Sequence, residues 1–216
     1  MTHIKISGIT DPEDARLAAR LGVDMVACVF YARSQRYVTQ SAAWAIRRAL
    51  PGHVALVGIF VDTPLPIVQQ VTYHCRLDHV QLFGSETRAD VEAIRPHAFK
   101  AVTVTQPELA ERAVRAFLGT RGGRHDAPAM LVNLTREARE RWSCLATAAG
   151  RHPLLLASPA LSATTAGAAI RIAQPWGVDV WEAVEASPGR LDPERVAAFV
   201  DAVRAADTAA ADDAAG

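Results

Sequence analysis

Short apolar runs alternate with longer amphipathic stretches along nearly the whole chain. The apolar runs have the length of strands buried on both faces, whereas the stretches between them repeat apolar residues with a helical period. Strands are predicted at residues 3–7, 24–31, 53–61, 78–83, 99–104, 128–133, 153–158 and 177–183. Helices are predicted at residues 11–22, 39–52, 64–75, 86–95, 107–119, 135–150, 162–174 and 192–206.

Eight strand–helix units predict a parallel sheet, because parallel strands need helical crossovers. Eight such units normally close into a barrel, so we expect a single (β/α)8 TIM barrel over residues 1–205. A doubly wound open sheet is the alternative architecture. Residues 206–216 are rich in Ala and Asp and contain no large apolar side chain, so we expect a disordered tail there.

Polar residues precede most of the predicted helices and indicate where they begin. The expected caps are Thr10 or Asp11, Thr39, Ser85, Thr135, Ser162 and Asp192. In such a barrel the functional residues lie at the carboxyl ends of the strands, which is where candidate chemistry is sought below.

Composition narrows the class of partner. The 216 residues include 23 Lys and Arg and 23 Asp and Glu, so the formal net charge is zero. A neutral chain without a long apolar run is a poor match for nucleic acid or a membrane. Three cysteines without metal-ligand spacing are typical of the reducing cytoplasm. We therefore expect a cytoplasmic protein without a metal or cofactor. Composition does not decide between a monomer and a homodimer, nor which small molecule is bound.

Several segments carry a specific resemblance to one family. They are KISGIT, GVDMVACVFYARSQRYV, VGIFVD, VQLFG and VDVWEAVEASPGRLD, in this order between about Ile4 and Val203. They resemble phosphoribosylanthranilate isomerase, a (β/α)8 barrel of tryptophan biosynthesis. The resemblance implies an Amadori rearrangement, in which a general acid protonates the ribose ring oxygen and a general base then removes the proton on C2′.

Two residues depart from the pattern of that family. Its base is a cysteine at the end of the first strand, where this chain has Ser7, and its acid is an aspartate after the sixth, where this chain has Asn133. A serine hydroxyl needs an adjacent base, and an amide cannot lend a proton. Losing each group is worth roughly 10²–10⁴-fold in rate, so we expect the ancestral activity to be weak or absent.

The implied phosphate site also departs from the family, which uses glycine-rich turns whose backbone N–H groups reach the anion. Here the turn after the seventh strand reads ASPA and contains Ser158. Trp181 and Glu182 stand after the eighth strand, where small neutral residues belong. We expect the indole to fill the space of a phosphate and the carboxylate to repel it.

Other candidates lie at further strand ends. The resemblance implies that Arg36 holds the carboxylate of the anthranilate ring, although it could instead pair with an acidic side chain. Gln81 is kept from the family, and Phe83 replaces its histidine, which favours an apolar ligand or simple packing. Asp62 could be an acid or base at the mouth or a solvated loop residue.

Lys5 and Asp179 have the same strand parity as Ser7 and Trp181, respectively, and lie on strands that are neighbours in a closed barrel. They are predicted to pair inside it, and a structural ion pair is the favoured interpretation. A catalytic lysine is the alternative, although a nearby carboxylate would raise its pKa.

Three functions are compatible with these residues. The main hypothesis is a repurposed enzyme, of isomerase or lyase type, that acts on a non-phosphorylated molecule such as an aromatic carboxylate held by Arg36. Its catalytic candidates are Ser7, Asn133, Glu182 and Asp62, and its binding candidates are Arg36, Gln81, Phe83, Ser158 and Trp181. The second hypothesis is a non-catalytic ligand- or partner-binding barrel. The third is a genuine phosphoribosylanthranilate isomerase with a rearranged site.

Overall fold

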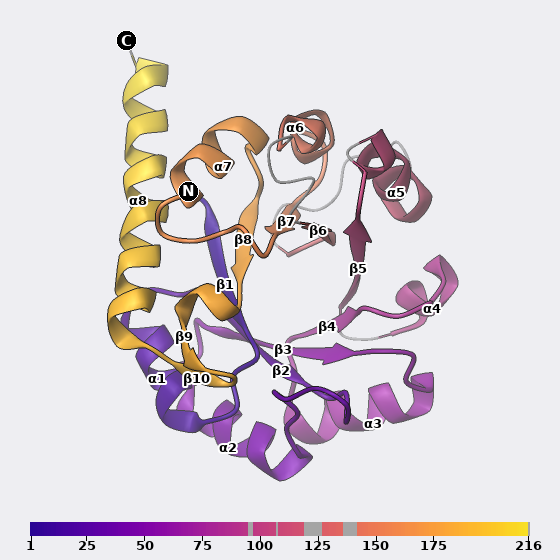
Figure 1. Ribbon diagram of the computed structural model, residues 1–216. Helices are drawn as coiled ribbons and strands as arrows, with labels where there is room; N and C mark the ends of the chain where they lie inside the picture. The colour runs from indigo at the N-terminus through magenta and orange to yellow at the C-terminus, as the bar shows by residue number, and fades with distance from the viewer. Residues whose placement is uncertain (95–96, 107, 119–126, 136–141, 216) are drawn as a thin grey trace.

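The strands form one closed barrel in the computed structural model, which describes residues 1–94, 97–106, 108–118, 127–135 and 142–215 (Figure 1). All neighbouring strands are parallel, and β1 pairs with β8 from His3↔Gly177 to Ile6↔Val180. This closing pair confirms the (β/α)8 barrel and excludes the open sheet. The strands are β1 (His3–Ser7), β2 (Met25–Val29), β3 (Ala55–Phe60), β4 (His79–Leu82), β5 (Ala98–Val104), β6 (Met130–Leu134), β7 (Leu154–Ala157) and β8 (Gly177–Val180).

Helices cover the outside of the barrel, one after each strand (Figure 1). They are α1 (Pro12–Arg20), α2 (Gln40–Ala49), α3 (Leu65–Cys75), α4 (Arg88–Ala93), α5 (Glu108–Leu118), α6 (Ser143–Ala149), α7 (Ala166–Ala173) and α8 (Pro193–Ala215). The part of the sixth predicted helix at residues 136–141 lies outside the described residues.

Some of the helix caps predicted from the sequence are present in the structure, and others are not. Asp11 and Thr39 cap α1 and α2 as predicted, each accepting a backbone hydrogen bond. For α4 the cap is Thr87, in a reciprocal capping box with Asp90, and not Ser85. Ser85 is unavailable because its hydroxyl donates to Asp62 across the barrel rim.

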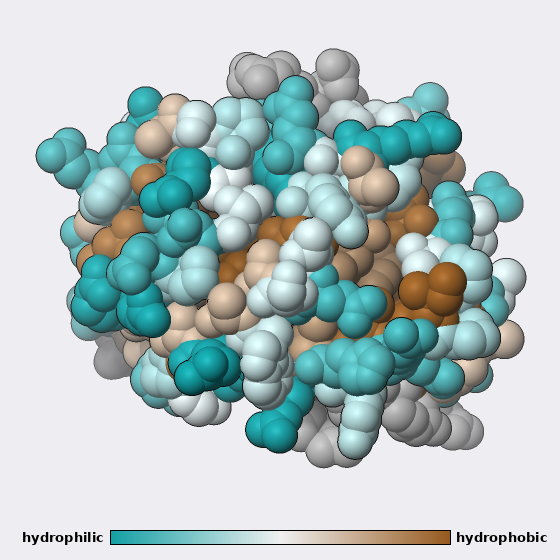
Figure 2. Space-filling model, turned by 90° about the horizontal axis from the view of Figure 1, so that it is seen from below, coloured by the Kyte–Doolittle hydropathy of each residue, from teal (hydrophilic) through white to brown (hydrophobic). Residues whose placement is uncertain are grey.

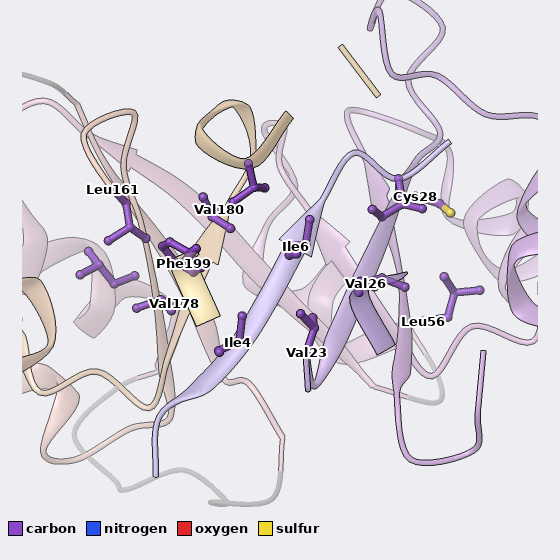
Figure 3. Close-up of a cluster of buried hydrophobic side chains, with 14 of the residues drawn as sticks. Ile4, Ile6, Val23, Val26, Cys28, Leu56, Leu161, Val178, Val180 and Phe199 are labelled. Atoms are coloured by element: carbon purple, nitrogen blue, oxygen red, sulfur yellow. The ribbon is translucent and has the colours of Figure 1, made fainter. Parts of the chain in front are cut away.

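The alternation of side chains along each strand creates two separate cores. Residues such as Ile4, Val26 and Val178 point outward and pack against the helices, as Figure 3 shows. The intervening positions point inward, where a smaller cluster that includes Ala27, Ile59 and Phe99 fills the barrel. Lys5, Ser7 and Asp179 belong by parity to this inner set, so the barrel interior contains charge.

The end of the chain differs from the prediction. Residues 206–215 continue α8 instead of forming a disordered tail. Alanine is the strongest helix former, and this segment contains no helix breaker before the final glycine. In addition, Asp207 accepts hydrogen bonds from the backbone N–H and the hydroxyl of Thr2, which ties this segment to the start of β1.

The eighth strand is shorter than predicted. It ends at Val180, and Trp181 leaves the extended conformation with φ −127° and ψ −97°. A short 3₁₀ helix, η2 (Glu182–Val184), and a hairpin of β9 (Glu185–Ser187) and β10 (Arg190–Leu191) follow. This turn brings Trp181 and its neighbours over the open end of the barrel.

The outer surface is mainly polar, with apolar side chains scattered over it. On the face shown in Figure 2, hydrophilic side chains surround a central area of more apolar ones. Exposed large apolar side chains occur on several helices, for example Ile67, Tyr73, Leu109 and Ile172. No described helix combines the length and apolar character that a membrane crossing requires.

We expect Gly177→Ala to destabilise the barrel where it closes. A Cβ at this position would lie 2.8 Å from the carbonyl oxygen of His3 and 2.9 Å from Cδ2 of Leu155. Overpacking of this kind lowers the free energy of unfolding by about 1–3 kcal/mol, measurable by urea denaturation. Gly52→Ala is the control, because a Cβ there meets nothing within 4 Å. Equal urea midpoints for the two variants would contradict this prediction.

Candidate active site

A cavity of about 310 Å³ lies at the carboxyl ends of the strands. Its position matches the functional face of a TIM barrel, and its walls combine apolar side chains with a few polar ones. It is lined by Arg36, Gln81, Phe83, Leu131, Asn133, Ala157, Ser158, Pro159, Leu161, Asp179, Trp181, Glu182 and Ala183.

Most of the candidates from the sequence meet in this cavity. Those that line it are Arg36, Gln81, Phe83, Asn133, Ser158, Trp181 and Glu182. Two candidates are outside the lining. Ser7 is buried beneath it, with 1% of its surface exposed, and Asp62 belongs to the rim between β3 and β4.

Asp62 is engaged in holding its own loop. Its Oδ1 accepts hydrogen bonds from the backbone N–H of Ser85 at 2.6 Å and from the Ser85 hydroxyl at 2.7 Å. These bonds lower the pKa of Asp62. The Asp62 carboxylate also lies so near residue 84 that only glycine fits there, because a Cβ would lie 2.4 Å from Oδ1 of Asp62. The carboxylate thus joins two rim loops.

The floor of the cavity is a buried polar cluster from β1 and β8. Ser7 Oγ donates to Oδ1 of Asp179 at 2.7 Å, and Lys5 Nζ donates to Ser7 Oγ at 2.5 Å. Lys5 Nζ also lies 3.1 Å from Oδ2 of Asp179, which accepts a further bond from the indole N–H of Trp181 at 3.0 Å. The predicted pairing of Lys5 with Asp179 is confirmed, and Ser7 stands between them.

Burial affects the pKa of Lys5 more than the nearby carboxylate does. We expected the nearby carboxylate to raise its pKa, and Asp179 does act in that direction. Desolvation outweighs this attraction, because Lys5 is completely buried, and the pKa of Lys5 is therefore lowered.

Arg36 is held in place by a partner that we did not predict. Its Nε and Nη2 donate to the two carboxylate oxygens of Glu185, at 2.7 Å and 2.5 Å. The Glu185 carboxylate also accepts the backbone N–H of Gly189 at 3.0 Å. The sequence left two interpretations of Arg36 open, and the structure shows that Arg36 does pair with an acidic side chain. Glu185 lies within the resembled segment VEASPGRLD, but nothing in the strand pattern pointed to it.

Trp181 and Glu182 both border the cavity. The Glu182 side chain is 79% exposed and approaches Arg36 Nη2 only to 3.7 Å, so solvent screens its charge. The indole of Trp181 turns toward Asp179 and lies with its ring 5.8 Å from Cζ of Arg36. The cavity beside both residues stays open.

Two amide side chains line the cavity, Gln81 from β4 and Asn133 from β6. Gln81 is 2% exposed, and its buried Oε1 has no hydrogen-bond partner among the described residues. An unpaired buried acceptor costs about 1–3 kcal/mol, so a ligand that donates a hydrogen bond there would remove this cost. Among the described residues Asn133 Nδ2 has one long contact, at 3.4 Å from Thr103 Oγ1, and Asn133 lines the cavity.

Comparisons with known proteins agree on one family. The model of the N-(5′-phosphoribosyl)anthranilate (PRA) isomerase family matches residues 4–120. The protein of this name from Geobacter sp. strain M21 is 38% identical over 204 residues, which cover 93% of this chain and 97% of the relative. That from Pseudomonas aeruginosa strain LESB58 is 39% identical over 202 residues, which cover 94% of this chain and 95% of the relative.

Solved structures give the same result. The phosphoribosyl anthranilate isomerase of Thermotoga maritima superposes with a TM-score of 0.85 at 30% identity, covering 95% of this chain and 100% of that one. A structure of such an isomerase in complex with reduced 1-(o-carboxyphenylamino)-1-deoxyribulose 5-phosphate superposes with a TM-score of 0.83 at 31% identity, with the same coverage.

These matches correct the main hypothesis from the sequence. A barrel repurposed for a non-phosphorylated molecule is not supported, because the relatives that match over nearly the whole chain carry the isomerase name. The expectation of a lost activity rested in part on a Ser7 hydroxyl without an adjacent base, whereas in the structure Ser7 Oγ contacts both Lys5 and Asp179. The chain belongs to the N-(5′-phosphoribosyl)anthranilate isomerase family.

Proposed function

We propose that the protein isomerises N-(5′-phosphoribosyl)anthranilate in tryptophan biosynthesis, as a cytoplasmic enzyme. The observation that carries this proposal is the end-to-end match to isomerases, at 38–39% identity over 93–94% of the chain, in a barrel with an open cavity at its functional face. The third hypothesis from the sequence thus replaces the first.

The cavity offers complementary groups for the two ends of such a substrate. The ligand in the similar complex carries a carboxyphenyl group and a phosphate. Arg36, whose Nη1 takes part in neither bond to Glu185, is placed to bind the ring carboxylate. Trp181 and Phe83 supply apolar surface for the ring, and the loops around Ser158 and Ala183 border the remaining part of the cavity, which is left for the phosphate.

The side-chain amides of Gln81 and Asn133 can form hydrogen bonds with the sugar part of the substrate. The unpaired Oε1 of Gln81 is an acceptor for an anilino N–H or a ribose hydroxyl. Asn133 Nδ2 is a donor for the ribose ring oxygen. An amide polarises that oxygen through a hydrogen bond but does not transfer a proton, so the proton that opens the ring comes from water in this proposal.

The direct test is turnover of N-(5′-phosphoribosyl)anthranilate by the purified protein, followed chromatographically as formation of the ketose product. The same gene is introduced into a tryptophan auxotroph that lacks the isomerase, and we expect growth without tryptophan. Binding of the reduced product analogue without turnover or growth would contradict the proposal and favour the non-catalytic barrel.

Arg36→Lys tests the assigned carboxylate contact. Lysine keeps the charge next to Glu185 but has a single nitrogen, so it cannot bond both Glu185 oxygens, as Arg36 Nε and Nη2 do, and also present a further nitrogen to the ring carboxylate. We expect the KM for the substrate to rise by roughly 10-fold or more, with a smaller change in kcat. Arg33→Lys in the same loop is the control, because Arg33 is exposed and outside the cavity lining. An unchanged KM in Arg36→Lys would remove Arg36 from the binding site.

Asn133→Asp tests how the ribose ring is opened. A carboxylic acid at this position adds a direct proton donor without a change in shape, so we expect kcat to rise by about 10-fold or more below neutral pH. Thr103→Val, which alters only the neighbour of Asn133, is the control for packing. If kcat is unchanged or falls in Asn133→Asp, ring opening does not depend on a donor at this wall.

A further inference from the structure

Resting on the proposed function, we propose that Asp179 is the catalytic base that removes the C2′ proton, and that Ser7, Lys5 and Trp181 are its positioning residues. The resemblance assigns the base to the end of the first strand, where this chain has Ser7. The geometry of the cavity floor instead assigns the role of the base to Asp179 on β8.

The first argument is access. Asp179 lines the cavity, whereas neither Ser7 nor Lys5 does. Ser7 and Asp179 are each only 1% exposed, so the lining of the cavity and not the exposed fraction separates them, and Ser7 Oγ is already between Lys5 Nζ and Asp179 Oδ1. A general base must come within hydrogen-bond distance of the proton it removes. The carboxylate meets this condition for a bound ligand, and the hydroxyl lies beneath it.

The second argument is the hydrogen-bond capacity of the carboxylate. Oδ2 of Asp179 receives two donors, the ammonium of Lys5 and the indole N–H of Trp181. Oδ1 receives one donor among the described residues, the hydroxyl of Ser7. Each carboxylate oxygen has about two acceptor sites, so Oδ1 retains one for a proton.

The third argument is the direction of the Ser7 hydrogen. Lys5 has no acceptor, so in the short contact to Ser7 its ammonium donates and the Ser7 hydroxyl hydrogen is directed to Asp179. Ser7 therefore supports a charged carboxylate, and its Oγ, which is outside the cavity lining, is engaged as acceptor from Lys5 and as donor to Asp179. A thiol would be a weaker donor to Asp179, so the serine suits this positioning role.

The step balances with the groups present. After ring opening the substrate is a protonated imine, with C1′ doubly bonded to nitrogen. The C2′–H bond breaks, and its proton passes to Oδ1 of Asp179. The electron pair of that bond forms the C1′=C2′ double bond, while the C1′=N pair moves onto nitrogen and neutralises it. The enol then becomes the ketone by gaining a proton at C1′ and losing its hydroxyl proton.

Trp181 couples this base to the binding site. Its indole N–H donates to Asp179, and its ring lies 5.8 Å from Cζ of Arg36. One side chain thereby sets the spacing between the carboxylate that removes the proton and the guanidinium assigned to the ring carboxylate. The charged groups nearest to Asp179 are thus Lys5 from β1 and, across the indole, Arg36.

The main test compares Asp179→Asn with Ser7→Ala in the full chain, using substrate with hydrogen or deuterium at C2′. We expect Asp179→Asn to lower kcat by about 10³-fold or more, while affinity for the reduced product analogue falls by less than about 10-fold. Ser7→Ala should lower kcat by only about 10-fold and keep a primary isotope effect. Asp24→Asn, at the opposite end of the barrel, is the control for an isosteric change in a hydrogen-bonded carboxylate.

Each outcome decides between the alternatives. Equal losses in Ser7→Ala and Asp179→Asn, or near-normal kcat in Asp179→Asn, would overturn the assignment while leaving the proposed function intact. Absence of turnover in the unmodified protein would instead overturn the proposed function. If Asp179→Asn alone fails to fold because Lys5 is left buried without a counter-ion, Lys5→Met combined with Asp179→Asn removes both charges, and we expect that variant to fold, bind the analogue and lack turnover.

Trp181→Phe separates positioning from simple packing. Phenylalanine keeps an aromatic ring but removes the hydrogen bond to Asp179. Loss of this donor leaves the carboxylate less firmly oriented, so kcat should fall more than affinity for the reduced product analogue. An unchanged kcat with reduced affinity for the analogue would show that Trp181 only packs against the ligand.

Discussion

The buried contact between Lys5 and Asp179 is the interaction on which the rest of this barrel depends. It joins the first strand to the last, within the pairing that closes the barrel, where Lys5 is completely buried and Asp179 is 1% exposed at the floor of the cavity. An ammonium and a carboxylate at this depth are tolerated only together, since either alone would be an uncompensated buried charge. Closure of the sheet and the chemistry of its open end therefore rest on the same two residues.

Much of the fold could be predicted, because it follows from periodicity. Alternating apolar runs and amphipathic stretches fixed the order of the elements and the barrel, and strand parity placed Lys5, Asp179 and Ser7 on the inner face. The errors occur where local chemistry competes with the pattern. Asp62 takes the hydroxyl of Ser85 that would have capped α4, and alanine-rich helix propensity together with Asp207 orders a segment that composition alone made resemble a tail.

The site could be predicted as a set of residues but not as a set of interactions. Position at strand ends was enough to find most of the residues that line the cavity. It could not show that Arg36 is gripped by Glu185, or that the indole of Trp181 turns toward Asp179, because these contacts depend on the turn after β8. The expectation that activity is lost failed for the same reason. It judged the Ser7 hydroxyl by its own acidity, whereas the hydrogen bonds with Lys5 and Asp179 determine the role of Ser7.

The engagement of Arg36 by Glu185 has a consequence for how a ligand arrives. Among the described side chains at the cavity, Arg36 and Lys5 face Asp179, Glu182 and Glu185, so these five groups together give no surplus of positive charge. A phosphorylated aromatic acid would then gain little from long-range attraction and would be recognised only at contact range. Its association rate should accordingly vary little with ionic strength. Anion-binding proteins with a positively charged surface around the site differ, because long-range attraction accelerates association there and salt weakens it.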